Sequence, residues 1–303
     1  MAYIVKYIKD FSNSEKIEQI CLKDISLGYK VMVFSDCASK CDLQVENTTF
    51  TFCHNAEQQA VEAAKKHYAE KCQFYVKHAV FSVDPDVYPD AYKIKEMDYE
   101  AAQELLVNGY NEIDYNVINI AKRGSVRLEI LSLTDNEPTT IKEVAAVDNN
   151  IIRSISQDSD IAVVTLTERP DKKGETFKIL KLLSDADIYV DSIMLSAPAM
   201  EHQNLSVCIR REDKQKVWQL LDENKASLSF KNILISENVT KISVMGSGFH
   251  TQKGVAAKLL EVLYVNDINI MMIFTSEVKI SIVIEKSQAN KAIHAIHKNL
   301  IAK

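Results

Sequence analysis

The sequence lacks the phosphate-binding loops that its glycine-containing segments first suggest. Between Gly246 and Glu277, three glycines precede an amphipathic run, but Thr251 occupies the third glycine position of a G-x-G-x-x-G motif. No Gly-Lys-Ser/Thr occurs anywhere, so a P-loop is missing as well. A helix N-terminus after these glycines would still present free N–H groups and a partial positive charge. The segment therefore favours a small anion or zwitterion over a nucleotide.

The chain also has no basic excess, no long apolar run and no complete set of metal ligands. Its 36 Lys and Arg against 42 Asp and Glu give a net charge of −6, which disfavours nucleic acid as a partner. No apolar run approaches the roughly 20 residues that span a membrane, and "MAYIVKYIKD" has no signal-peptide core. Cys37 and Cys41 form a C-x3-C pair without the second pair that zinc requires. These absences predict a cytoplasmic protein with reduced thiols, no metal and no membrane segment.

The first half of the chain alternates strand-like and helix-like segments. "AYIVKYI", "SNSEKIEQICLKDISLG" and "YKVMVFS" are typical of a strand, a helix and a strand, a β-α-β opening that predicts a parallel sheet. The alternation continues to a strand at "SVRLEILSL". "TDNEPTT" (134–140) predicts an exposed linker, so we place a first domain at residues 1–142.

The second half contains an internal repeat. Sliding residues 172–196 by 80 positions onto residues 252–276 gives nine identities in 25 aligned positions without a gap. Each copy predicts the order β-α-β-β-α, which needs one more strand to complete a ferredoxin-like βαββαβ unit. "NNIIRSISQ" (149–157) and "SLSFKNILIS" (227–236) are the candidates for these strands.

These repeats resemble the tandem ACT domains of aspartokinases. "GFHTQKGVAAKLLEVLYVNDINIMMIFTSEVKISIVIE" resembles the second ACT domain of that family and "PDKKGETFKILKLLSDADIYVDSIMLS" the first. The resemblance implies a first ACT domain at 143–235, with strand exchange to the second, and a second ACT domain at 236–303. It extends upstream in altered form, which implies a trimmed amino-acid-kinase-like αβα domain. The fold class expected is α/β and α+β.

The upstream segments depart from the kinase motifs that they resemble. "IVKYIKDFS" stands where K-F-G-G-T-S is expected; Lys6 and Ser12 remain, while Ile8 and Lys9 replace the glycines. "CHNAEQQAVEAA" replaces a glycine-rich segment and brings in Glu57. Side chains in place of glycines obstruct close approach to an anion, and phosphoryl transfer depends on neutralising phosphate charge. About 15 residues fill the place of a large aspartate-binding block. We therefore expect no catalytic residues and interpret Lys6 as a surface or strand-end lysine.

The resemblance implies an effector pocket at the first glycine turn. The family positions that carry over suit an amino-acid ligand. Asp191 would bind its ammonium group, and backbone N–H groups of the turn would bind its carboxylate. In this sequence they are Asp171, Gly174, Glu175, Thr176, Val190, Asp191, Asn269, Ile270, Thr275, Ser276 and Glu277. With Asp191 and Glu175 in one pocket, lysine is favoured mildly over threonine.

The leading hypothesis is a noncatalytic aspartokinase-family regulatory protein that binds lysine or threonine without a cofactor and forms a homodimer through its ACT domains. One alternative is a divergent active aspartate kinase that uses ATP and Mg²⁺ to convert L-aspartate to 4-phospho-L-aspartate. Another is a regulatory subunit that associates with an active aspartokinase.

Overall fold

The computed structural model describes residues 2–10, 12–36, 44–77, 79–107, 110, 112–143, 152–170, 172–197, 202–246, 249, 253–276 and 278–301. The chain divides into two compact units, residues 1–149 and 150–302. Among the described helices, none is both long enough and apolar enough to cross a membrane.

The first unit consists of one mixed sheet and its covering helices. The elements are β1 (Tyr3–Ile8), α1 (Ser14–Ser26), β2 (Lys30–Ser35), β3 (Thr48–Phe52), α2 (Ala56–Lys66), β4 (Lys71–Val76), β5 (Glu96–Met97), α3 (Tyr99–Val107), α4 (Tyr115–Gly124), β6 (Leu128–Ser132) and β7 (Asp135–Ile141). The strand order is β3-β2-β1-β4-β6-β7-β5. The first five of these strands, β3 to β6 in this order, run parallel to one another, as the β-α-β opening predicts.

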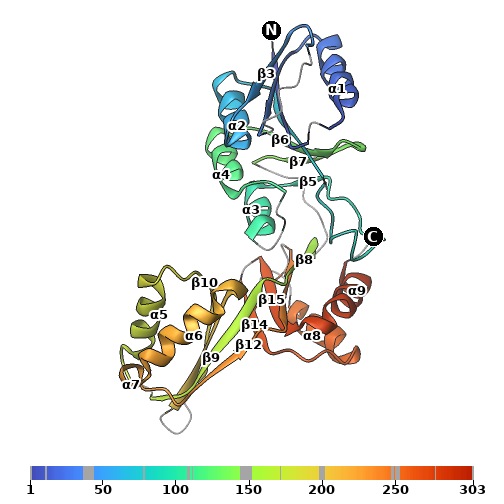
Figure 1. Cartoon of the computed structure of the whole chain (residues 1–303). Helices are drawn as coiled ribbons and strands as arrows, with labels where there is room; N and C mark the ends of the chain where they lie inside the picture. Colours follow the sequence, from blue (N-terminus) through green and yellow to red (C-terminus); the bar gives the residue numbers. More distant parts are fainter. Residues whose placement is uncertain are drawn as a thin grey trace. The chain divides into compact units, whose positions relative to one another are not determined.

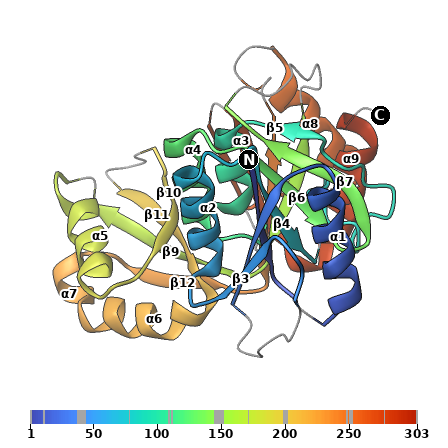
Figure 2. The same cartoon turned by 90° about the horizontal axis from the view of Figure 1, so that it is seen from above.

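Helices cover both faces of this sheet, which gives the expected αβα arrangement. Helix α1 lies on one face, and α2 and α4 lie together on the other (Figures 1 and 2). On its own face, α1 buries Ile17 and Cys21 in a cluster with Ile8 of β1 and Val31 of β2. A crossover helix of this kind is what a parallel strand pair requires.

The prediction of an exposed linker at residues 134–140 is wrong, because residues 135–141 form β7. It pairs antiparallel with β6, with Glu129 opposite Thr140, and parallel with β5. Thr139 is fully buried and its hydroxyl donates to the Ile94 carbonyl at 2.5 Å. The polar composition of the segment suggested a loop, but hydrogen bonding to a strand on each side overrides that local preference.

The second unit contains two four-stranded antiparallel sheets. Its elements are β8 (Ser154–Asp158), β9 (Ile161–Pro170), α5 (Glu175–Asp185), β10 (Val190–Leu195), β11 (His202–Arg210), the 3₁₀ turn η1 (Arg211–Asp213), α6 (Lys214–Glu223), α7 (Lys225–Leu228), β12 (Asn232–Ser236), β13 (Val239–Met245), α8 (Val255–Val265), β14 (Met272–Thr275), β15 (Lys279–Glu285), the 3₁₀ turn η2 (Lys286–Gln288) and α9 (Ala289–Leu300). The strand orders are β10-β11-β9-β12 and β14-β15-β13-β8.

The two repeats exchange a strand. Strand β8 precedes the first repeat but pairs with β13 of the second, with Ser156 opposite Ser243. Strand β12 lies between the repeats and pairs with β9 of the first. Each sheet therefore reaches four strands by using one of the two segments that the sequence offers for this purpose, and each repeat depends on a strand from outside its own β-α-β-β-α segment.

Side chains of β9 alternate between two apolar clusters. Ala162, Val164 and Leu166 face the helices of the first repeat, in a core that also contains Ile179 of α5. Ile161 and Val163 face the other way and pack with Met272 and Val283 of the second sheet. The period-2 pattern of β9 thus serves both a sheet–helix core and a sheet–sheet interface.

Candidate functional site

The turn before α5 has the backbone geometry that its glycine predicts. Gly174 precedes the helix with φ of 88°, in the left-handed region, and caps it without a side-chain hydrogen bond. A Cβ built on Gly174 would meet nothing within 4 Å, so glycine is required by this backbone conformation and not by space. Gly254 has the same role before α8, with φ of 89°.

Arg169 lies beneath this turn, and the sequence interpretation missed it. Its side chain is fully buried, with 0% exposure. Its Nη2 donates to Thr176 Oγ1 at 3.2 Å, in the first turn of α5. Its Nε and Nη1 are buried and have no hydrogen-bond partner among the residues that the structure describes. A buried donor left unpaired costs about 1–3 kcal/mol, so this arrangement is unfavourable for the unliganded chain.

A β-bulge directs Arg169 toward the helix. Leu166 lies opposite Leu205, but Arg169 lies opposite Gln203, so β9 has one residue more than β11 over this interval. Glu168, inside it, has φ of 50°. Because a bulge shifts the alternation by one residue, Arg169 comes to lie on the face that Leu166 occupies. No local sequence signal marks this shift.

Glu175, a predicted site residue, is the acidic neighbour of Arg169. It is 7% exposed, and its Oε1 accepts from Lys178 Nζ at 2.7 Å. Its Oε2 is buried and has no hydrogen-bond partner within the described part of the chain. Burial lowers the pKa of Arg169, and the charge of Glu175 acts in the opposite direction. Of the predicted residues, Thr176 thus contacts the Arg169 guanidinium and Glu175 acts on its charge, while Asp171 lies outside the described residues.

Asp191 and Val190 lie at the other end of the same sheet. Ser192 is opposite Cys208 of β11, whereas Arg169 is opposite Gln203. Five residues of strand separate these levels, which is on the order of 15–20 Å. Asp191 and the glycine turn therefore do not form one pocket within a single chain. The argument for lysine, which placed Asp191 beside Glu175, loses its basis there.

The partner of Asp191 is a lysine of the chain itself. Lys241 of β13 is buried, and its Nζ lies 2.9 Å from Asp191 Oδ2 and 3.7 Å from Asp158 Oδ2. Burial acts to raise the pKa of Asp191, but the Lys241 ammonium, with help from Ser192, outweighs it and holds that pKa below its usual range. Lys241 thus occupies the position assigned to the effector ammonium.

The predicted residues of the second repeat lie at the two ends of β14. Asn269 is exposed and Ile270 half-buried before the strand begins, and Thr275 and Ser276 are exposed where it ends. In the turn that follows, Ser276 N donates to the Lys279 carbonyl at 2.9 Å. Glu277 lies outside the described residues.

Lys6 is neither a surface lysine nor a strand-end lysine, so that interpretation was wrong. It lies within β1, is 1% exposed, and its Nζ contacts Asp24 of α1 and Gln73 of β4. Gln73 in turn donates to Glu129 Oε2 at 2.9 Å. Lys6, Gln73 and Glu129 are cross-strand neighbours, which makes Lys6 part of a polar row across the sheet. Burial lowers its pKa, against the attraction of Asp24.

The N-terminus of α2 is occupied by a carboxylate of the chain. Ala56 N donates to Asp36 Oδ1 at 2.8 Å, and the Tyr7 hydroxyl donates to Asp36 Oδ2 at 3.0 Å. Glu57 Oε2 accepts from Asp114 N at 2.8 Å. Burial raises the pKa of Glu57, which the Asp114 N–H opposes. This edge of the sheet therefore presents carboxylates where a phosphate site would need cations and free N–H groups.

The other predicted kinase features of the first unit are similarly unsuited to a nucleotide. Ser12 is exposed in the turn before α1, where its N–H donates to Asp10 Oδ1 at 2.8 Å. Strand β2 ends at Ser35 and β3 begins at Thr48, so a short connection replaces the expected block.

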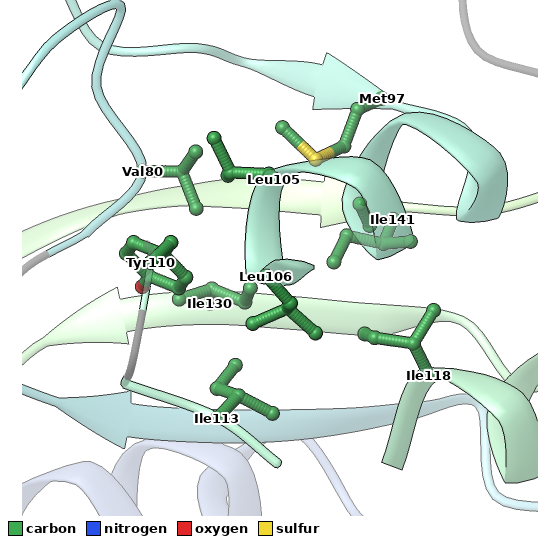
Figure 3. Close-up of a pocket in the computed structure, with 10 residues that line it drawn as sticks. Val80, Met97, Leu105, Leu106, Tyr110, Ile113, Ile118, Ile130 and Ile141 are labelled. Atoms are coloured by element: carbon green, nitrogen blue, oxygen red, sulfur yellow. The ribbon is translucent and has the colours of Figure 1, made fainter. Parts of the chain in front are cut away.

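A small pocket in the first unit is apolar. It lies around α3 and is lined by residues that include Val80, Met97, Tyr110 and Ile141 (Figure 3). None of the described residues that line it carries a charge. It therefore cannot neutralise a triphosphate.

Comparisons with known proteins agree with this architecture. A family model described as an ACT domain matches residues 242–300. The aspartokinase of Bacillus sp. (strain MGA3) is 34% identical over 242 residues, which cover 79% of this chain and 58% of the relative. The aspartokinase of Pseudomonas aeruginosa is 30% identical over 243 residues, which cover 78% and 58%. The chain thus spans less than two thirds of the length of these curated relatives.

A solved structure shows the same fold over nearly the whole chain. The aspartate kinase of Clostridium acetobutylicum superposes with a TM-score of 0.75 at 18% identity, covering 97% of this chain and 68% of that one. The expected fold class, with an αβα sheet followed by ferredoxin-like ACT units, is therefore confirmed. Together, these comparisons show that the chain is similar to aspartokinases over 79% of its length and carries an ACT domain at residues 242–300.

Proposed function

We propose that this protein is a regulatory member of the aspartokinase family that binds lysine or threonine through its ACT repeats and has no kinase activity. It would act in the cytoplasm, in the aspartate-derived amino-acid pathway, without a cofactor. The observation that carries the proposal is a contrast between two anion-binding positions. The N-terminus of α2 is filled by Asp36, whereas two donors of Arg169, at the first turn of α5, find no acceptor in the part of the chain that the structure describes.

Electrostatics argue against phosphoryl transfer in the first unit. Transfer from ATP needs cations and backbone N–H groups that neutralise charge developing on the phosphates. Here Lys9 is paired with Glu112 at 3.2 Å, and Lys6 is buried against Asp24. A phosphate at the α2 edge would displace Asp36 and approach Glu57, a repulsive arrangement.

The effector is expected to be recognised by its amino-acid backbone. Asp191 is neutralised by Lys241, and Glu175 retains one free oxygen next to a guanidinium. This pair of opposite charges suits the α-carboxylate and α-ammonium groups that lysine and threonine share. The contacts described here therefore do not distinguish the side chains of the two amino acids. The two amino acids therefore stand as equal candidates.

A sheet edge supports the proposed homodimer. Strand β10 is an edge strand of the first sheet, and its Ile193 and Leu195 are 48% and 47% exposed. Exposed apolar edges of this kind are normally paired or covered. A second copy is our first choice of partner, and an active aspartokinase that receives this chain as a regulatory subunit is the alternative. Light scattering should give a dimer at micromolar protein; a stable monomer with and without lysine or threonine would contradict it.

Two measurements test the function. Calorimetry with lysine, threonine and methionine in turn should detect binding of lysine or threonine below millimolar concentration; binding of none would refute the sensor. A coupled ADP-release assay with L-aspartate, ATP and Mg²⁺ should show only background turnover. Turnover that a Lys6→Met variant abolishes would instead favour an active kinase. Methionine preserves the volume of the buried lysine better than alanine does, and an unfolding curve should accompany that variant.

A further inference from the structure

Arg169 is a buried cation whose binding capacity is largely unused. A guanidinium has five N–H donors and suits two-point recognition of a carboxylate. Arg169 donates to Thr176, and although the side chain is fully buried, its Nε and Nη1 have no partner in residues 2–301 apart from the segments that the structure does not describe. Native proteins rarely leave such groups unsatisfied, so each case calls for an explanation, of which a bound water or ion is one.

The fold itself does not require this polar cluster. In the gap-free alignment of the two repeats, Glu175 and Thr176 correspond to Val255 and Ala256. Helix α8 nevertheless has the same length as α5 and follows a glycine in the same conformation. The second repeat therefore builds the same turn from apolar residues, and the polar set of the first repeat serves another purpose.

The charges of the cluster match a zwitterion. Glu175 Oε2 is buried with no partner among the described residues, and the charge of Glu175 acts on Arg169. A carboxylate would satisfy the free N–H groups of Arg169, and an ammonium would satisfy Glu175. Either charge alone would leave one of the two protein groups unpaired, at a cost to binding.

We propose that Arg169 binds the carboxylate of an amino-acid ligand while Glu175 holds its ammonium group. This inference rests on the proposed function, because it assigns the contacts of the same sensor. It differs from the arrangement that the sequence suggested, in which backbone N–H groups bound the carboxylate and Asp191 the ammonium.

The test compares each amino acid with its amide, which lacks the carboxylate charge. For the wild-type full chain, calorimetry should show lysine or threonine binding about tenfold to a hundredfold more tightly than lysinamide or threoninamide. Arg169→Met should weaken binding of the acid to the level of the amide and leave binding of the amide nearly unchanged. Arg169→Lys, which keeps the charge but not the two-point geometry, should fall between them.

A structural role for Arg169 predicts a different result. If Arg169 only stabilised the fold, Arg169→Met would lower the unfolding midpoint without ligand. Relief of a buried unsatisfied charge should instead leave that midpoint unchanged or raise it. Arg211, whose Nη2 donates to the Ser159 carbonyl at the other end of β9, is the matched control. Arg211→Met should keep the preference for acid over amide.

The outcomes separate the two proposals. An acid preference that survives in Arg169→Met, or a large loss of stability in that variant and in Arg169→Lys, would overturn the role of Arg169 and leave the sensor intact. A wild type that binds neither acid nor amide would overturn both.

A second arm tests Glu175. N-acetylated amino acids, which lack the ammonium, should bind the wild type at least tenfold more weakly than the free amino acid, and Glu175→Gln should remove this difference. Lys178→Met breaks the 2.7 Å contact to Glu175 Oε1 without touching Oε2, and should retain the difference. If the affinity difference between free and N-acetylated amino acids disappeared in both Glu175→Gln and Lys178→Met, Glu175 would be excluded as the ammonium partner.

Discussion

The N-termini of α2 and α5 differ in whether a carboxylate of the chain accepts a hydrogen bond from the first helical N–H group. At α2 the first helical N–H donates to Asp36 of the chain, and Tyr7 donates to the same carboxylate. At α5 the cap is Gly174, which has no side chain, and the first helical N–H, of Glu175, donates to the Lys172 carbonyl at 3.3 Å. Arg169 keeps two donors that have no partner among the described residues. A helix N-terminus is thus a potential anion site only while the chain supplies no anion of its own. In this protein Asp36 fills that position at α2, whereas no described side chain caps α5, although Glu175 lies in its first turn.

The largest expected effect on stability concerns the ion pair between Lys241 and Asp191. Lys241→Met should lower the free energy of unfolding by about 3 kcal/mol, because it leaves a half-buried carboxylate without its cation. Urea denaturation measures this. Adding Asp191→Asn should recover part of the loss; a double variant as unstable as Lys241→Met would contradict the explanation. Lys181→Met, in the exposed pair with Asp185, should change stability by less than about 0.5 kcal/mol.

The glycine turns permit a sharper comparison between repeats. Gly174→Ala and Gly254→Ala should each lower the free energy of unfolding by about 1–2 kcal/mol, because both residues have φ near 90°. Equal stability losses are expected, measured by thermal or urea unfolding. Only Gly174→Ala should also weaken lysine or threonine binding in calorimetry. A comparable weakening by Gly254→Ala would place the effector at the second repeat.

Removing the internal anion at α2 should have a smaller effect. Asp36→Ala should lower the free energy of unfolding by about 1 kcal/mol, as for loss of a helix-capping side chain. It should not create nucleotide binding, because Glu57 and the Glu112–Lys9 pair remain nearby. Titration of the variant with MgATP and with inorganic phosphate is the measurement. Micromolar ATP binding would mean that Asp36 alone blocks a preserved site.

The smallest expected effect is a dependence of stability on acid pH. The pKa of Asp191 is lowered in the folded state, so its contribution is present above the unfolded value of 3.8 and is lost as pH falls through the folded value. Wild-type stability should therefore decline more steeply below about pH 4 than that of Asp191→Asn. Parallel curves in urea unfolding at several acid pH values would show that Asp191 does not titrate as described.

Much of the architecture was predictable because it depends on local patterns. The gap-free repeat predicted two copies of one unit, and both contain a helix of equal length after a glycine in the left-handed region. The β-α-β opening predicted the parallel strands around β1. Residues 134–140 were the exception, since a polar segment became β7 through pairing with its neighbours.

The candidate site was only partly predictable for the same reason. Gly174, Glu175 and Thr176 are contiguous, so a turn motif identifies them. Arg169 faces them only because a bulge shifts the alternation of β9.

By itself, the sequence determined the repeated unit, its glycine turns and the loss of the kinase glycines, since these follow from residue type and short-range spacing. Only the tertiary structure decided which charges meet. Lys241 and Asp191 are 50 residues apart and Lys6 and Gln73 are 67 apart, yet each pair is in contact. The physical reason is that a buried charge must find a partner wherever the fold places one, and the distance along the chain does not constrain that choice.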